Sequence, residues 1–186
     1  GIEFRPSTLA GSTFVGLSAG AQYATGFFST SYNTAFGYTA FAQNSSGTSN
    51  VAIGYQALSA NTSSFNTAVG RALFNSTSGY NTAVGFNSSA LSTTTANITA
   101  IGSQAGLYQK ADYTTAFGYN SIAGGTSGTN LGSANTAVGA NSQGNLSFST
   151  NTAGYWNVSL GSTSLSKLSS GIGNTGLGYQ ALAINT

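Results

Sequence analysis

The side chains with the strongest intrinsic chemistry in this sequence are six charged residues, namely Glu3, Arg5, Arg71, Lys110, Asp112 and Lys167. The 186-residue chain contains no histidine and no cysteine. Catalytic triads, carboxylate pairs and metal centres each need several acids, histidines or cysteines close together. We therefore expect no enzyme activity, no cofactor and no metal site.

The net charge of +2 and the pI of about 9.0 rest on few groups, because only 3% of the residues are charged. Nucleic-acid binding draws its affinity from several phosphates neutralised together, which four scattered cations do not supply. No apolar run approaches the roughly 20 residues that cross a bilayer. We expect neither a nucleic-acid partner nor membrane insertion.

A second kind of chemistry is N-glycosylation, for which the chain offers seven Asn-x-Ser/Thr sequons. They lie at Asn44, Asn61, Asn75, Asn87, Asn97, Asn145 and Asn157. Chance alone predicts most of them in a chain so rich in Asn, Ser and Thr. Most lie between the repeated units described next, where a glycan would project, so modification there and on Ser/Thr loops stays an open alternative.

A five-residue unit with the consensus Asn-Thr-Ala-apolar-Gly occurs ten times. The copies are residues 12–16, 33–37, 50–54, 66–70, 81–85, 98–102, 114–118, 135–139, 157–161 and 174–178. The closing glycines are 15 to 22 residues apart, and the larger steps hold insertions such as Gly124 to Asn130. The insertions indicate loops within a preserved period.

Each unit reads as a short strand bounded by turns. The second residue is Thr or Val and the fourth is apolar in all ten copies. Residues two apart on a strand share a face, so we expect both to point inward and the third, usually Ala, to point outward. The predicted core is Val15, Phe36, Ile53, Val69, Val84, Ile101, Phe117, Val138, Leu160 and Leu177. Asn and Gly are placed at the corners because both tolerate a positive φ.

A single unit cannot close a core, but stacked units pair their backbones at about 4.8 Å and bury one continuous column. A second apolar pair, as in Ala57-Leu58, supplies the opposite wall. The predicted fold is an all-β parallel β-solenoid or β-roll of about ten rungs of 15–22 residues. We assign residues 12–186 to this domain and residues 1–11, with the single Pro, to an N-terminal docking or capping segment, with docking favoured.

The copies Asn33-Thr34-Ala35-Phe36-Gly37-Tyr38 and Asn50-Val51-Ala52-Ile53-Gly54-Tyr55-Gln56-Ala57-Leu58 resemble the head repeats of trimeric autotransporter adhesins and similar repeats in phage tail fibres. The copy from Asn174 to Leu182 does so too. The resemblance runs from about Ser12 to the last residue. It implies a left-handed parallel β-roll, commonly trimeric, displayed on a surface for attachment.

These observations predict a structural, self-assembling fibre or filament protein with an adhesive display role. Its location would be extracellular, on a cell surface or on a virion. Its main partner would be itself, as a trimer or helical filament, because so neutral a chain has little charge to oppose association. Binding would fall to loops such as Gly124 to Asn130 or Gly139 to Thr150.

Two alternatives stay open. The aromatic residues after the glycine (Tyr38, Tyr55, Phe86, Tyr119 and Tyr179) form either a structural ladder or a stacking surface for sugars, as in a glycan- or receptor-binding head. The Thr column suggests an ice-binding solenoid, although the inward register expected for it disfavours that function.

Overall fold

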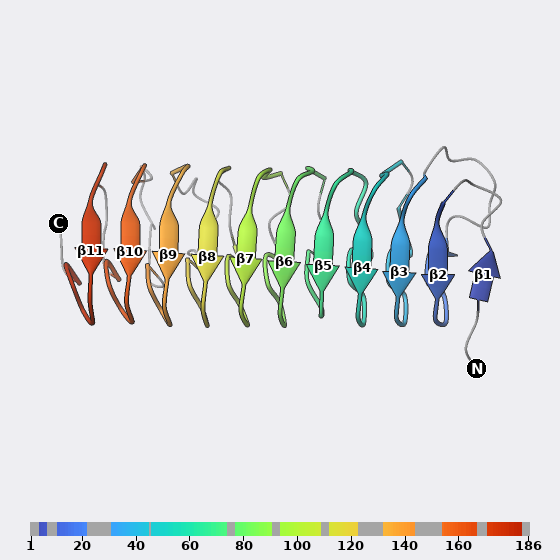
Figure 1. Cartoon of the computed structure of the whole chain (residues 1–186), viewed down its shortest axis with the longest axis horizontal. Helices are drawn as coiled ribbons and strands as arrows, with labels where there is room; N and C mark the ends of the chain where they lie inside the picture. The colour runs from blue at the N-terminus through green and yellow to red at the C-terminus, as the bar shows by residue number, and fades with distance from the viewer. Residues whose placement is uncertain are drawn as a thin grey trace.

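The computed structural model describes residues 4–6, 11–21, 31–44, 46–73, 77–90, 94–108, 112–122, 132–143, 154–166 and 171–183. Eleven three-residue strands lie side by side along one elongated body in chain order (Figure 1). They are β1 (Phe4–Pro6), β2 (Thr13–Val15), β3 (Thr34–Phe36), β4 (Val51–Ile53), β5 (Thr67–Val69), β6 (Thr82–Val84), β7 (Thr99–Ile101), β8 (Thr115–Phe117), β9 (Thr136–Val138), β10 (Val158–Leu160) and β11 (Thr175–Leu177).

Strands β2 to β11 form a parallel sheet in which equivalent repeat positions are paired. In β3 and β4, for example, Ala35 pairs with Ala52 and Phe36 with Ile53. The ladder continues past the strand, since the Gly37 N–H donates to the Val15 carbonyl at 2.9 Å. Each repeat is therefore one turn of an all-β parallel β-solenoid, as the sequence predicts.

The N-terminal strand β1 departs from this pattern because it pairs antiparallel with β2. Its partner residues run from Phe4 opposite Val15 to Pro6 opposite Thr13. This pairing gives the β2 edge of the parallel sheet a neighbouring strand, which a capping segment would do. Docking of residues 1–11 on another molecule stays a prediction.

The glycine that closes each unit is required by the stacking. Gly102 has a φ of +131°, and a Cβ built on it would lie 2.5 Å from the Gly118 carbonyl oxygen in the next rung. A side chain at this corner would collide with backbone, which cannot swing away as a side chain would. The glycine column thus fixes how closely successive corners approach.

The asparagine that opens seven of the ten units has a different role from the one expected. It does not take the positive φ of the corner; the residue before it does, as at Tyr32 with a φ of 60°. Instead the Asn side chain is buried and bonds to the neighbouring rung. The Asn50 backbone N–H donates to Asn33 Oδ1 at 2.8 Å, and the Asn66 N–H donates to Asn50 Oδ1 at 2.8 Å. The prediction that Asn serves as a left-handed corner residue is wrong.

The interior is lined by the third residue of each unit, so the predicted core is also wrong. Phe14 and the Ala of β3 to β9 are at most 2% exposed, whereas Phe36, Ile53, Phe117, Leu160 and Leu177 are 42 to 71% exposed. Val69, Val84, Ile101 and Val138 are half-buried, and Val15 alone of the ten is buried. The second and fourth residues do share a face, but that face points to solvent.

The opposite wall of the interior follows the expected second apolar pair. Ala57, Leu58, Ala72 and Leu73 are fully buried and belong to the same cluster as the inward Ala residues. Where Ser replaces Ala in this wall, its hydroxyl is satisfied by the next rung, as when Ser88 Oγ donates to the Ala100 carbonyl at 2.8 Å. The apolar core is thin, so the hydrogen bonds between successive rungs hold much of the fold in place.

Candidate functional site

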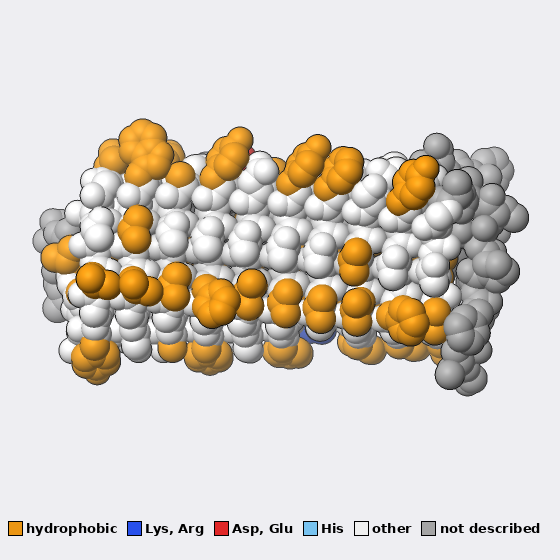
Figure 2. All heavy atoms as spheres, in the orientation of Figure 1, with side chains coloured by type: hydrophobic (Ala, Val, Ile, Leu, Met, Phe, Trp, Pro, Cys, Tyr) orange, Lys and Arg blue, Asp and Glu red, His pale blue; other side chains and the backbone are white. Residues whose placement is uncertain are grey.

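The solvent face of the parallel sheet carries two columns of side chains that run the length of the rod. The outward Thr column consists of Thr13, Thr34, Val51, Thr67, Thr82, Thr99, Thr115, Thr136, Val158 and Thr175. Beside it lies the apolar stripe, made of the fourth-position residues Val15, Phe36, Ile53, Val69, Val84, Ile101, Phe117, Val138, Leu160 and Leu177. Figure 2 shows hydrophobic side chains following one another along this face. The Thr column thus faces solvent, against the inward register predicted for it.

Aromatic residues flank these two columns on both sides. The glycine-side column is Tyr38, Tyr55, Phe86, Tyr119 and Tyr179, which are 49 to 73% exposed. Where aromatic residues occupy adjacent rungs the rings stack, as for Tyr38 and Tyr55, whose centroids are 5.6 Å apart with planes 8° from parallel. The ladder predicted from the sequence is therefore present at this pair.

A second aromatic column was missed by the sequence reasoning. This corner column precedes the Asn of the repeat and contains Tyr32, Phe65, Tyr80, Tyr113 and Trp156, which are 50 to 66% exposed. The signal was available, because each lies one residue before the repeat unit. A left-handed corner favours Gly or Asn, so the position by itself predicts no aromatic residue.

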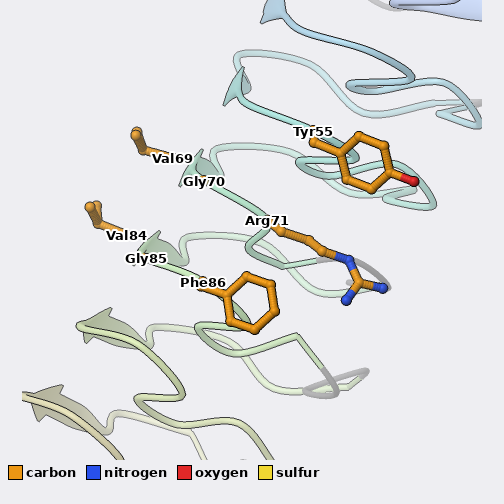
Figure 3. A pocket seen from close by; sticks show the side chains of 7 residues that line it. All are labelled: Tyr55, Val69, Gly70, Arg71, Val84, Gly85 and Phe86. Atoms are coloured by element: carbon orange, nitrogen blue, oxygen red, sulfur yellow. The ribbon is translucent and has the colours of Figure 1, made fainter.

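The glycine-side column is interrupted at Arg71, where the rung lacks an aromatic residue and leaves a hollow. Tyr55 and Phe86 border the hollow, Val69 and Val84 of the apolar stripe form its other side, and its volume is about 530 Å³ (Figure 3). Arg71 Nη1 donates to Asn87 Oδ1 at 3.1 Å, which ties the guanidinium to the next rung. The hollow is an open, largely apolar depression in the outward face.

The sequons fall into three groups. Asn44, Asn61 and Asn157 are at most 1% exposed and hydrogen-bonded, so a glycan there is incompatible with this fold. The expectation that a glycan would project from between the units is therefore wrong at Asn44 and Asn61. Asn87 is half-buried and accepts from Arg71, whereas Asn97 is exposed. Asn75 and Asn145 lie outside the described residues, as does the loop from Gly124 to Asn130.

The described residues hold little else that could perform chemistry. Among them no three His, Cys, Asp or Glu side chains gather where they could hold a metal ion. In the same part of the chain, no helix has the length and apolar character needed to cross a membrane. The loop from Gly139 to Thr150 is described only as far as Gln143, where it forms a turn.

Comparisons with protein-family models, with curated proteins and with solved structures found no match for this chain. Any conclusion about function therefore rests on the fold and on the outward face of the sheet. What they define is a parallel β-solenoid that exposes a long apolar stripe between two aromatic columns.

Proposed function

We propose that this protein is a structural subunit that assembles with copies of itself into an extracellular fibre or filament, displayed on a cell or virion surface with an adhesive role. The observation that carries the proposal is the apolar stripe, where Phe36, Phe117 and Leu177 are 48, 51 and 71% exposed. The resemblance of the repeats to adhesin heads and tail fibres agrees with it. No catalysis is part of the proposal.

The size of the outward face supports association between copies. Ten strands at about 4.8 Å give a length of roughly 45 Å, and the six residue steps from one aromatic column to the other span about 20 Å. The face thus covers on the order of 900 Å², similar to the roughly 800 Å² that each partner buries in a stable complex. Exposed apolar patches larger than a few hundred Å² mark interaction sites in soluble proteins.

The charge of the molecule also favours association. Arg71 is the only cation and Asp112 the only acid among the side chains that the structure describes. Neither belongs to the Thr column or the apolar stripe, so packing two such faces together desolvates no charge from these columns. Like-charge repulsion between copies is correspondingly small. A trimer and a helical filament are both compatible with this surface.

The test replaces part of the stripe without touching the interior. The variant carries Val84→Thr, Ile101→Thr and Phe117→Thr. Thr suits a strand and already occupies the neighbouring column, so the fold is retained. Losing about 1 kcal/mol of apolar burial at each site weakens association roughly a hundredfold.

The matched control changes the neighbouring column on the same three strands, with Thr82→Ser, Thr99→Ser and Thr115→Ser. Sedimentation and light scattering measure the oligomers, and electron microscopy of the native material looks for filaments. We expect the wild type and the control to associate and the stripe variant to dissociate. A wild-type chain that stays monomeric at high concentration refutes the proposal.

A second candidate function, ice binding, is favoured by the outward direction of the Thr column. The Thr side chains on a flat parallel sheet repeat at the rung spacing of about 4.8 Å, so their hydroxyls form a regular array in contact with water. Phe36 and Phe117 interrupt the flatness of the neighbouring stripe, which is why assembly is preferred. Thermal hysteresis that is lost when Thr82, Thr99 and Thr115 are replaced by larger residues would favour ice binding.

A further inference from the structure

The corner aromatic column lies at a left-handed backbone position, as several other turn positions of this solenoid do. Tyr32, Phe65, Tyr80, Tyr113 and Trp156 all have φ between 56° and 62°. This left-handed region costs a residue with a side chain roughly 1–2 kcal/mol relative to its normal conformations. The other five rungs fill the same position with small residues, namely Gly11, Ser49, Asn97, Ala134 and Gly173, which adopt the same left-handed conformation. Nothing in the corner geometry itself asks for a large ring.

Burial within the chain does not compensate this cost. Tyr80, Tyr113 and Trp156 are 63, 65 and 66% exposed, so most of each ring lies in water. Phe65 and Tyr80, on adjacent rungs, gain a stacking contact with centroids 4.9 Å apart. Tyr113 has aromatic residues two rungs away on either side and only Asn97 and Ala134 between. Strained and exposed aromatic residues of this kind indicate a role toward something outside the chain.

The spacing of the rings is regular along the rod. Tyr80, Tyr113 and Trp156 precede β6, β8 and β10, so each lies two rungs, or about 9.6 Å, from the next. The corner follows the same ladder as the strands, since the Tyr113 N–H donates to the Ala96 carbonyl at 3.2 Å and the Trp156 N–H donates to the Ser133 carbonyl at 3.4 Å. Figure 2 shows hydrophobic side chains spaced along the upper edge of the outward face.

The polar residues near the rings are mostly uncharged, and Asp112 is the one charged residue among those described at this corner. Asp112 precedes Tyr113, and its Oδ1 accepts the Ala96 N–H at 2.8 Å, which ties the carboxylate to the neighbouring rung. Asn97 and Thr99 are exposed between Tyr80 and Tyr113. The described cation, Arg71, lies in the glycine-side column instead. A carboxylate accepts hydroxyl hydrogen bonds and repels anions, which favours an uncharged, hydroxyl-rich ligand.

We propose that the corner column is a binding platform for an extended, uncharged, β-linked glycan that lies parallel to the rod. Pyranose rings present C–H-rich faces that pack on aromatic rings, as other apolar groups do. In an extended β-linked chain each sugar advances by about one rung, so alternate sugars meet Tyr80, Tyr113 and Trp156. Their hydroxyls meet Asn97, Thr99 and the Asp112 carboxylate.

This platform rests on the proposed display role and gives it a ligand class. The Thr column separates the corner column from the apolar stripe, so copies can associate through the stripe while the corner binds glycan. A second copy of the chain is the other occupant that aromatic residues would suit. The hydrogen-bond acceptors beside the rings and the two-rung period favour the glycan, and the oligomeric state of the variants distinguishes the two.

The test removes the rings and leaves the backbone conformation in place. The variant carries Tyr80→Asn, Tyr113→Asn and Trp156→Asn, because Asn97 already occupies this corner with a φ of 59°. The matched control removes three rings from the other column, with Tyr38→Asn, Tyr119→Asn and Tyr179→Asn. Calorimetric titration with cellohexaose and chitohexaose measures binding, and alginate oligomers serve as the anionic probe.

We expect the wild type and the control to bind a neutral oligosaccharide, with alginate weaker. Each single corner substitution should weaken binding about fivefold, and the triple variant should lose at least fiftyfold, at unchanged or raised thermal stability. Three results overturn the platform: no neutral binding by the wild type, an equal loss in the control, or tighter binding of alginate. A triple variant that loses its oligomeric state instead identifies the corner as a contact between copies. Failure of the assembly proposal is read separately, from a wild-type chain that stays monomeric at high concentration.

Discussion

Replacing Asn50 tests whether the buried asparagine column holds the rungs together. Asn50 is fully buried, its Oδ1 accepts the Asn66 N–H at 2.8 Å, and its Nδ2 donates to the Ser63 carbonyl at 2.9 Å and to Asn33 Oδ1 at 3.1 Å. Asn50→Ala removes all three bonds. The Ser63 carbonyl keeps the Asn61 Nδ2 donor at 2.7 Å, so the Asn66 N–H is the group left buried without this acceptor.

The expected loss follows from these bonds. Hydrogen bonds contribute about 1 kcal/mol each, and an unsatisfied buried donor costs about 1–3 kcal/mol, so Asn50→Ala should lower the free energy of unfolding by about 3–5 kcal/mol. For a chain of this size each kcal/mol shifts the melting temperature by roughly 2–4 °C, so we expect a fall of about 10 °C. Far-UV circular dichroism during thermal and denaturant unfolding measures it. Val51→Thr, on the outward Thr column of the same rung, is the control and should change stability by less than about 0.5 kcal/mol.

Asn50→Asp adds a pH signature. The carboxyl keeps an acceptor for the Asn66 N–H but places oxygen against the Ser63 carbonyl and Asn33 Oδ1, and burial and these acceptors raise its pKa in the folded state. The unfolded value is about 3.9, so the protonated form stabilises the fold below that pH, and the stability is lost as pH rises toward the folded pKa. The variant should therefore gain stability on acidification relative to wild type. If Asn50→Ala unfolds like Val51→Thr, or Asn50→Asp shows no pH dependence, the column does not hold the rungs together.

Three further predictions test the turns, the interior and the sequons. Gly102→Ala should cost at least about 2 kcal/mol in denaturant unfolding, since its φ of +131° and the facing carbonyl exclude a Cβ; a neutral result would mean the corners can separate. Ala100→Leu should destabilise by about 1–3 kcal/mol through overpacking while the neighbouring outward Thr99→Leu stays within about 0.5 kcal/mol; equal effects would contradict the inward assignment. Expressed through a glycosylating secretory pathway, folded protein should carry sugar at Asn97 and none at Asn61 by mass spectrometry, and a glycan at Asn61 in folded material would be inconsistent with its burial.

The repeat was readable from the sequence because it has a constant five-residue pattern. Thr or Val at the second position and an apolar residue at the fourth predict a strand, and Gly at the fifth predicts a turn. The structure confirms these elements from β2 to β11 and their parallel stacking. It also confirms Ala57-Leu58 as part of the opposite wall. Local residue preferences are enough for these conclusions, since strands and turns form over a few residues.

The functional surface was predicted less well. The glycine-side aromatic column was recognised, whereas the corner column with Tyr80 and Trp156 was not, because a left-handed corner favours Gly or Asn and predicts no aromatic residue. The sequons could not be sorted either: Asn61 and Asn97 share a motif but differ in burial, which depends on the rung next to them. Such differences in burial depend on how neighbouring rungs stack, which the sequence of a single unit does not show.

By itself the sequence determined that this chain forms short strands separated by turns and winds into stacked rungs. Only the tertiary structure decided which side of each strand faces inward. An alternating strand allows two answers, and the larger residues Phe36 and Ile53 suggest the wrong one. The opposing wall, with Ala57 and Leu58, comes so close to the sheet that Ala52 fills the remaining space. Larger side chains are therefore left in solvent, where they form the stripe on which the proposed assembly rests.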